Sequence, residues 1–161
     1  MPDKKIYILT GSIQSGKTTK LLQWSVEKKN VFGILTPVVE GKKVFMDAHT
    51  REQFAMEAEP GEEGILSVGR FSFSKKAFEK AIDILNQSMK EKKGWLIIDE
   101  IGPLELEGKG FFETAKQILS NQNSFNLLFI IREHLVEKAI DFFKLERNKI
   151  VIVKTDSEIF G

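Results

Sequence analysis

The hydrophobic residues of this chain gather into short, nearly continuous runs that are separated by stretches of mixed polarity. Four or five apolar residues in a row, without polar alternation, are typical of strands buried on both faces of a parallel sheet. The last such run, Ile150–Val153, lies close to the end of the chain. We expect strands at 6–9, 31–36, 44–47, 65–68, 95–98, 127–131 and 150–153.

The stretches between these runs show helical periodicity, with apolar residues three or four positions apart. Phe78, Ile82, Leu85 and Met89 form one such stripe, and Ser74 before it is a suitable N-cap. Helices are predicted around 17–29, 75–89, 111–119 and 135–140. Strands that alternate with helices predict an α/β fold of three layers, built on a mainly parallel sheet.

Two segments depart from this alternation. The turn Glu40-Gly41-Lys42 between 31–36 and 44–47 predicts a β-hairpin at one edge of the sheet. Residues 50–64 contain Pro60, two glycines and five glutamates, and we expect a solvated loop there. No repeat or linker divides the chain, so residues 1–161 are interpreted as a single domain.

Composition narrows the classes of function. The net charge is +1, and the lysine pairs are interspersed with acids, so neither a nucleic-acid stripe nor a membrane surface is indicated. There is no cysteine and no apolar run long enough to span a bilayer, and we do not expect the N-terminal residues to act as a signal peptide. We therefore expect a cytoplasmic protein; the sequence leaves a protein partner or a homo-oligomer open.

The segment after the first predicted strand carries the most specific chemical signal. Residues 11–18 read G-S-I-Q-S-G-K-T and satisfy the P-loop (Walker A) pattern at every position. A strand leads into the loop and a helix leads out, which is the arrangement that directs backbone N–H groups and the helix dipole at a phosphate. The predicted nucleotide-binding residues are Gly11, Ser12, Ile13, Gln14, Ser15, Gly16, Lys17, Thr18 and Thr19.

Within this loop, Lys17 is expected to reach the β- and γ-phosphates of ATP or GTP, and the Thr18 hydroxyl to join the shell of a Mg²⁺ ion. A P-loop also needs an acid on a neighbouring strand to hold that ion. Asp99 and Glu100 directly follow the apolar run Trp95–Ile98, at the carboxyl end where α/β folds bind their ligands. We expect Asp99 to lie opposite Thr18 and hold Mg²⁺ through water, and Glu100 to orient or deprotonate the attacking water.

Arg132 follows the predicted strand 127–131 and is a candidate for sensing the γ-phosphate or acting as an internal arginine finger. The alternative is a simple ion pair, with Glu133 or Asp99 as partner. Arg70 is a weaker candidate. His49 and His134 lack metal-ligand spacing and are expected at the surface.

The segment Asp99-Glu-Ile-Gly-Pro-Leu-Glu-Leu106 resembles the D-E-I-G-x-x-E-L signature of the THEP-type nucleoside triphosphatases. The ending Gly16-Lys17-Thr18-Thr19, the segment Val68-Gly-Arg-Phe71 and the pattern Gly33-x-x-Thr36 are similar to that family as well. The resemblance spans nearly the whole chain. It implies a RecA-like P-loop fold and Mg²⁺-dependent hydrolysis of ATP, GTP and other triphosphates, with Lys17, Thr18, Asp99 and Glu100 in the roles given above.

Some positions differ from the family pattern. Ile13-Gln14 replaces Pro-Gly, Pro37 and Val38 replace acids, and Ser157-Glu158 stands where the family tends to carry Asn-Arg. The resemblance implies no role for Glu105, and a carboxylate in a loop or at a helix start is the plain interpretation of that residue.

Two other functions remain in competition with hydrolysis. One is a nucleotide-dependent switch that acts on a protein partner, with the glutamate-rich loop Glu57–Glu63 and the edge hairpin as recognition elements. The other is a small-molecule or nucleotide kinase, which needs a lid of clustered arginines. The four arginines of this chain are scattered, so the kinase is the less favoured of the two.

Overall fold

The computed structural model describes residues 5–11, 17–26, 28, 30–91, 93–121 and 125–154. The helices are α1 (Lys17–Val26), α2 (Lys75–Ser88), α3 (Phe112–Ser120) and α4 (Val136–Phe142). The parallel strands are β1 (Ile6–Thr10), β2 (Val31–Leu35), β8 (Trp95–Asp99), β9 (Asn126–Ile130) and β10 (Ile150–Lys154). The remaining strands are β3 (Val38–Val39), β4 (Lys42–Asp47), β5 (Gln53–Ala55), β6 (Ile65–Val68) and β7 (Phe71–Ser74).

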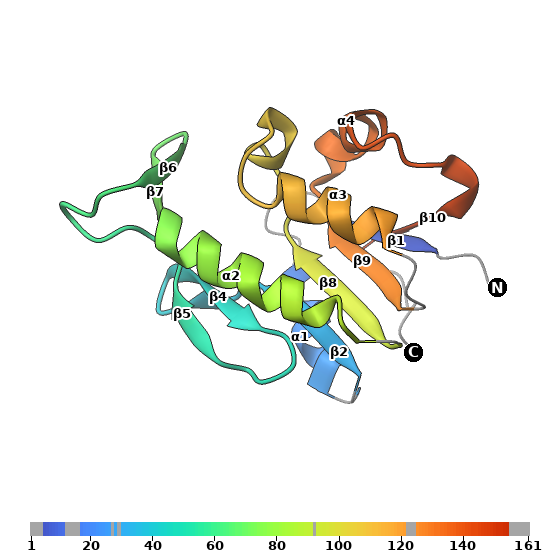
Figure 1. The fold of residues 1–161 in the computed structure, drawn as a ribbon, viewed down its shortest axis with the longest axis horizontal. Coiled ribbons are helices and arrows are strands. Elements are labelled where there is room, and N and C mark those ends of the chain that lie inside the picture. Colours follow the sequence, from blue (N-terminus) through green and yellow to red (C-terminus); the bar gives the residue numbers. More distant parts are fainter. Residues whose placement is uncertain are drawn as a thin grey trace.

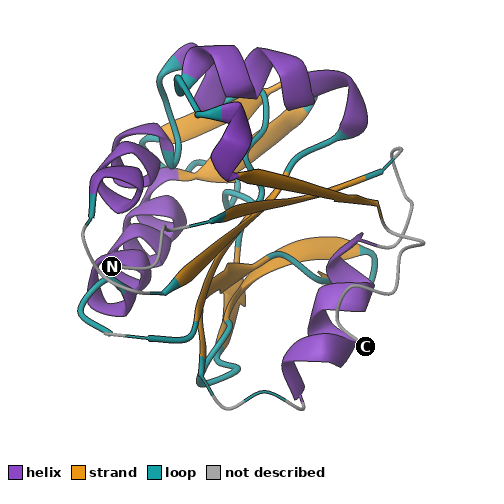
Figure 2. Ribbon diagram, turned by 90° about the vertical axis from the view of Figure 1, so that its right-hand side faces the viewer, coloured by secondary structure: helices purple, strands orange, loops and turns teal. Residues whose placement is uncertain are grey.

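Within the described residues, eight strands form one sheet in the order β10-β1-β9-β8-β2-β4-β3, with β5 on β4. Helices α2, α3 and α4 pack on one face, around Phe45, Phe78 and Phe129, and α1 packs on the other, around Trp24 and Leu128. Figure 2 shows the sheet between these two helical layers. The expected three-layer, mainly parallel α/β fold is confirmed.

The edge hairpin is also confirmed: β3 and β4 are antiparallel, and the turn between them is Glu40-Gly41. A second hairpin, β6–β7, forms a separate two-stranded sheet that projects beside the start of α2 (Figure 1). Ser74 at the end of β7 caps α2 as expected, because its hydroxyl oxygen accepts the Ala77 N–H at 3.1 Å.

Two expectations were wrong. Residues 50–64 are more than a solvated loop, because Gln53–Ala55 pairs with β4 and the Phe54 and Met56 side chains pack against the core. The strand that carries Asp99 is not adjacent to the strand of the P-loop either, since β9 lies between β1 and β8. Hydrophobic runs predict that strands exist, whereas strand order depends on contacts between distant segments.

Gly33 explains how closely β2 and β8 approach one another. Its φ is +110°, and a Cβ atom built on it would lie 2.1 Å from the Ile97 carbonyl oxygen. No residue with a side chain fits there without moving β8. Because β2 ends at Leu35, this close pairing also fixes the position of Thr36 beside the end of β8. Among the described residues, no helix has the length and apolar content needed to cross a membrane.

Candidate active site

The parallel strands of the sheet end together at one edge, which we call the carboxyl edge. The chain leaves β1 at Gly11, β8 at Asp99-Glu100 and β9 at Arg132 on this edge. The segments after β1 and β9 are tied together, because the Glu133 N–H donates to the Gly11 carbonyl oxygen at 3.1 Å. The topology therefore brings Gly11, Asp99 and Arg132, which are far apart in sequence, to the same edge of the sheet.

Asp99 lies at the centre of this group and is 1% exposed. Its Oδ2 atom accepts a hydrogen bond from the Thr18 hydroxyl at 2.7 Å and from the Thr36 N–H at 3.0 Å. Burial, followed by repulsion from Glu100, raises the pKa of Asp99, while the bonds from Thr36 and Thr18 act in the opposite direction. The expected placement of Asp99 opposite Thr18 thus agrees with the geometry.

Glu100, one residue further along, is partly exposed, with 21% of its side chain accessible. Two cations approach the same carboxylate oxygen: Arg132 Nη2 lies 3.5 Å from Glu100 Oε1 and Lys43 Nζ lies 3.7 Å from it. Arg132 does form an ion pair, then, but its partner is neither Glu133 nor Asp99. The peptide bond between Asp99 and Glu100 is cis.

Lys17 begins α1 and is only 9% exposed. Its Nζ donates to the Gly11 carbonyl oxygen at 3.4 Å. Burial lowers the pKa of Lys17, against the attraction of Glu100 and Asp99; Arg132 and Lys43 also lower it by repulsion. The same electrostatic neighbourhood therefore contains three cations and two carboxylates.

Of the predicted nucleotide-binding residues, Ser12, Ile13, Gln14, Ser15 and Gly16 lie outside the described residues, as do Ser157 and Glu158. Gly11, Lys17 and Thr18 lie at the carboxyl edge, and Thr19 is exposed on α1. Arg70 lies elsewhere, in the turn between β6 and β7, where it is exposed and lies over the Phe71 ring. His49 and His134 are exposed, as expected.

Three residues of this region were not identified from the sequence. Lys43 comes from the edge hairpin, and nothing local predicts that the hairpin reaches Glu100. Thr36 contributes a backbone N–H, and its only sequence signal was the Gly33-x-x-Thr36 pattern. Glu105 is 4% exposed, and its carboxylate oxygens accept the Gly102 and Phe111 N–H groups, each at 2.9 Å. Burial raises the pKa of Glu105 to about 7.

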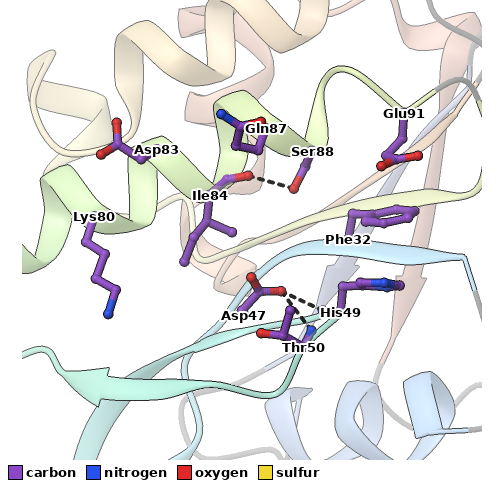
Figure 3. Close-up of a pocket in the computed structure, with 10 residues that line it drawn as sticks. All are labelled: Phe32, Asp47, His49, Thr50, Lys80, Asp83, Ile84, Gln87, Ser88 and Glu91. Atoms are coloured by element: carbon purple, nitrogen blue, oxygen red, sulfur yellow. Dashed lines mark hydrogen bonds between the residues drawn. The ribbon is translucent and has the colours of Figure 1, made fainter.

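A separate cavity of about 320 Å³ lies between α2 and the segment that follows β4 (Figure 3). Phe32, Asp47, His49, Lys80 and Ile84 are among the residues that line it. None of Lys17, Thr18, Asp99 and Glu100 takes part in this lining. This cavity is therefore distinct from the place where the charges of Lys17, Asp99 and Glu100 converge.

Comparison with known proteins identifies the family of the chain. The solved structures that resemble this chain include THEP1 from the hyperthermophile Aquifex aeolicus, with 25% sequence identity and a TM-score of 0.71 over 92% of this chain and 88% of the other. A human cancer-related nucleoside triphosphatase shares the fold at 23% identity, with a TM-score of 0.67 over 97% and 90% of the two chains. No curated protein sequence gives a match. A family model described as NTPase matches residues 6–158. The chain therefore belongs to the NTPase family, of the THEP type, and is a hydrolase of nucleoside triphosphates.

Proposed function

We propose that this enzyme hydrolyses ATP, GTP and other nucleoside triphosphates to the diphosphate and phosphate, that it requires Mg²⁺, and that Glu100 activates the attacking water. The observation that carries this proposal is the position of Glu100. It lies beside the Asp99–Thr18 pair and within the electrostatic neighbourhood of Lys17, where its carboxylate is partly open to solvent. A carboxylate in that position can accept a proton from water next to a bound γ-phosphate.

The donor atoms at the carboxyl edge fit magnesium. Thr18 Oγ1 and Asp99 Oδ2 are oxygen ligands, 2.7 Å apart, of the kind that Mg²⁺ prefers. Among the described residues, no group of three His, Cys, Asp or Glu side chains could hold a metal ion. That agrees with an ion held by one or two protein oxygens together with water and substrate phosphates. When bound, Mg²⁺ would neutralise charge on the phosphate oxygens, with Thr18 and, through water, Asp99 holding it.

The cations at the carboxyl edge supply the remaining electrostatics. Lys17 is proposed to bind the β- and γ-phosphates, since its ammonium group is buried at the start of α1 beside Gly11. Arg132 is proposed to stabilise charge on the γ-phosphate, because it is held next to the P-loop strand through the Glu133–Gly11 hydrogen bond. In the structure Arg132 pairs with Glu100, so the phosphate would replace that partner.

Residues 1–161 are proposed to act as one domain, because β1 and β10, from opposite ends of the chain, pair residue by residue from Ile6–Ile150 to Thr10–Lys154. We propose similar use of ATP and GTP, because the sequence contains no base-reading motif such as N-K-x-D.

The test is phosphate release from Mg-ATP and Mg-GTP by the wild type, by Glu100→Gln and by Glu133→Gln, with the nucleotide products resolved. Glu133 makes a matched control, since it also follows a strand at the carboxyl edge but is exposed and pairs with Lys154. We expect diphosphate and phosphate from the wild type, a loss of roughly 100-fold in Glu100→Gln with nucleotide affinity retained, and little change in Glu133→Gln. Wild-type turnover by Glu100→Gln would assign the water-activating role to another residue.

A further inference from the structure

Glu105 belongs to the segment that links β8 to α3, and it is the buried acid of that segment, for which the proposed chemistry has no use. It begins a short 3-10 helix, Glu105–Glu107, yet it is 4% exposed, whereas Glu107 in the same turn has 64% of its side chain exposed. A buried carboxylate is costly unless hydrogen-bond donors surround it. The burial of Glu105 therefore needs a structural explanation, whereas Glu107 is an ordinary exposed acid.

The two carboxylate oxygens of Glu105 join the two ends of this segment. Oε1 accepts the N–H of Gly102, two residues after Glu100, and Oε2 accepts the N–H of Phe111, the residue before α3, each at 2.9 Å. Phe111 is 1% exposed and packs against the rings of Phe45 and Phe78. One end of the bridge is therefore anchored in the core, and the other holds the backbone that follows Glu100.

The position of Gly102 matters to Glu100 in two ways. Between them, the Ile101 N–H donates to the Ile130 carbonyl oxygen of β9 at 2.9 Å, so two successive backbone N–H groups after Glu100 are fixed. A Cβ atom on Gly102 would lie 3.8 Å from the carboxyl group of Glu100, which places that side chain directly over Gly102. By contrast, the contacts that hold the Glu100 carboxylate itself, from Arg132 and Lys43, are long.

The absence of a side chain at Gly110 makes room for the Glu105 carboxylate. Gly110 has a φ of +58°, and a Cβ atom there would lie 2.1 Å from Glu105 Oε2. Gly108, three residues after Glu105, has a φ of +80° and open space around its Cα. Both glycines adopt left-handed backbone, but only Gly110 must lack a side chain to admit the carboxylate.

We propose that Glu105 is a positioning residue for hydrolysis: its carboxylate fixes the backbone at Gly102 and so holds Glu100 in the orientation needed to activate water. This inference rests on the proposed role of Glu100. Glu105 itself touches neither nucleotide nor water in this scheme, and it acts through the segment 100–102.

The first test replaces Glu105 by Gln, which keeps the shape but offers one acceptor oxygen to two N–H donors. We expect kcat for Mg-ATP to fall about 10-fold or more with the nucleotide Kd changed less than about twofold, because misplacement of a reacting group costs rate rather than binding. Glu107→Gln is the matched control and should behave as wild type. In the Glu100→Gln background, Glu105→Gln should cause no further loss, because the group that it positions is already absent.

A second pair of variants disturbs the same carboxylate without removing it. Gly110→Ala should lower kcat in the same way, and Gly108→Ala, which carries the same left-handed strain in open space, should not. If Glu105→Gln fails to fold, this pair of variants still tests whether the position of the Glu105 carboxylate affects kcat.

Several outcomes would overturn the inference. These are wild-type kcat in Glu105→Gln, a loss that appears in Kd rather than in kcat, an equal further loss in the Glu100→Gln background, or equal effects of Gly110→Ala and Gly108→Ala. If Glu100→Gln slows hydrolysis but Glu105→Gln does not, the inference fails alone. If Glu100→Gln has wild-type turnover, the proposed function of Glu100 fails, and the inference fails with it.

Discussion

The carboxyl edge and the cavity beside α2 are both places where a ligand could be sought, but their polar groups are arranged differently. At the cavity, Asp47 Oδ1 accepts the N–H groups of His49 and Thr50 at 2.8 and 3.1 Å, and Lys80 pairs with Glu52 at 2.8 Å. At the carboxyl edge, the ion pairs of Glu100 are 3.5 and 3.7 Å long. Asp47 and Lys80 at the cavity therefore have close partners, whereas the cations around Glu100 at the edge approach it without forming short ion pairs.

This difference in ion pairing favours the carboxyl edge over the cavity as the phosphate site. A phosphate-binding site needs several like charges held near one another, an arrangement that is unfavourable until the ligand arrives. Burial is the main cause that lowers the pKa of Lys17, and repulsion from Arg132 and Lys43, the other two cations of the edge, lowers it further. The capped turn at His49 and the Lys80–Glu52 ion pair stabilise the fold, and they already occupy Asp47 and Lys80, two of the charged groups of the cavity.

The strongest test of this comparison is Lys17→Ala. Loss of the buried ammonium group that is proposed to contact phosphate should weaken triphosphate binding by roughly 100-fold or more, because truncating a buried charge pair costs about 3 kcal/mol. Lys20→Ala, one turn further along α1, is the control and should retain affinity. Calorimetric titration with Mg-ATP measures both. Unchanged affinity in Lys17→Ala would contradict the assignment of the carboxyl edge as the site.

The pH dependence of stability should differ between the two regions, because a buried carboxylate belongs to the edge region and none is found at the cavity among the described residues. Burial raises the pKa of Glu105 from its ordinary 4.5 to about 7, with a smaller contribution from the negative charge of Glu100. The folded state thus binds this proton more tightly than the unfolded state. The contribution of Glu105 to the free energy of unfolding should fall as pH rises from about 4.5 to 7, and should level off above that.

Glu105→Gln removes this dependence. The difference in free energy of unfolding between wild type and variant should therefore change by about 3 kcal/mol between pH 4.5 and 7. Asp99 and the other carboxylates are present in both proteins, so their contributions to the pH dependence cancel in this difference. Urea unfolding at pH 5, 6, 7 and 8 measures the difference, with Glu107→Gln as control. Parallel curves for wild type and Glu105→Gln would show that the pKa of Glu105 is not raised.

The parts of the edge that were predictable from sequence share a local signal. Asp99 and Glu100 follow an apolar run, and Lys17 and Thr18 lie in a pattern fixed by backbone geometry. Residues adjacent in sequence were therefore enough to predict these positions. The remainder depends on contacts between distant segments. Lys43 reaches Glu100 only because β4 pairs with β2, and β9 separates β1 from β8 only in the assembled sheet. Glu105 looks like a solvated loop acid because its donors, Gly102 and Phe111, supply backbone N–H groups that no side-chain pattern reveals.

Arg132→Ala should have a smaller effect than Lys17→Ala, because Lys17 and Lys43 would still supply positive charge. We expect kcat to fall about 10-fold to 100-fold, as when one transition-state donor is removed, with a modest change in Kd. Arg147→Ala is the control, since Arg147 is exposed and pairs with Glu137. Steady-state phosphate release and calorimetry separate the two quantities. If Arg132 only forms an ion pair with Glu100, kcat in Arg132→Ala will equal that of the wild type.

The smallest effect is expected at the cavity, and it completes the comparison. Lys80 lines the cavity, pairs with Glu52 at 2.8 Å and lies over the Phe54 ring at 4.5 Å. Lys80→Ala should lower stability by at most about 1 kcal/mol, because the pair is exposed, and should leave kcat and KM within about twofold of wild type. Thermal unfolding and steady-state kinetics measure these. A rise in KM in Lys80→Ala, with stability unchanged, would place part of the nucleotide in the cavity. The loss of this exposed lysine, which is distant in sequence from the P-loop, would then have weakened substrate binding directly.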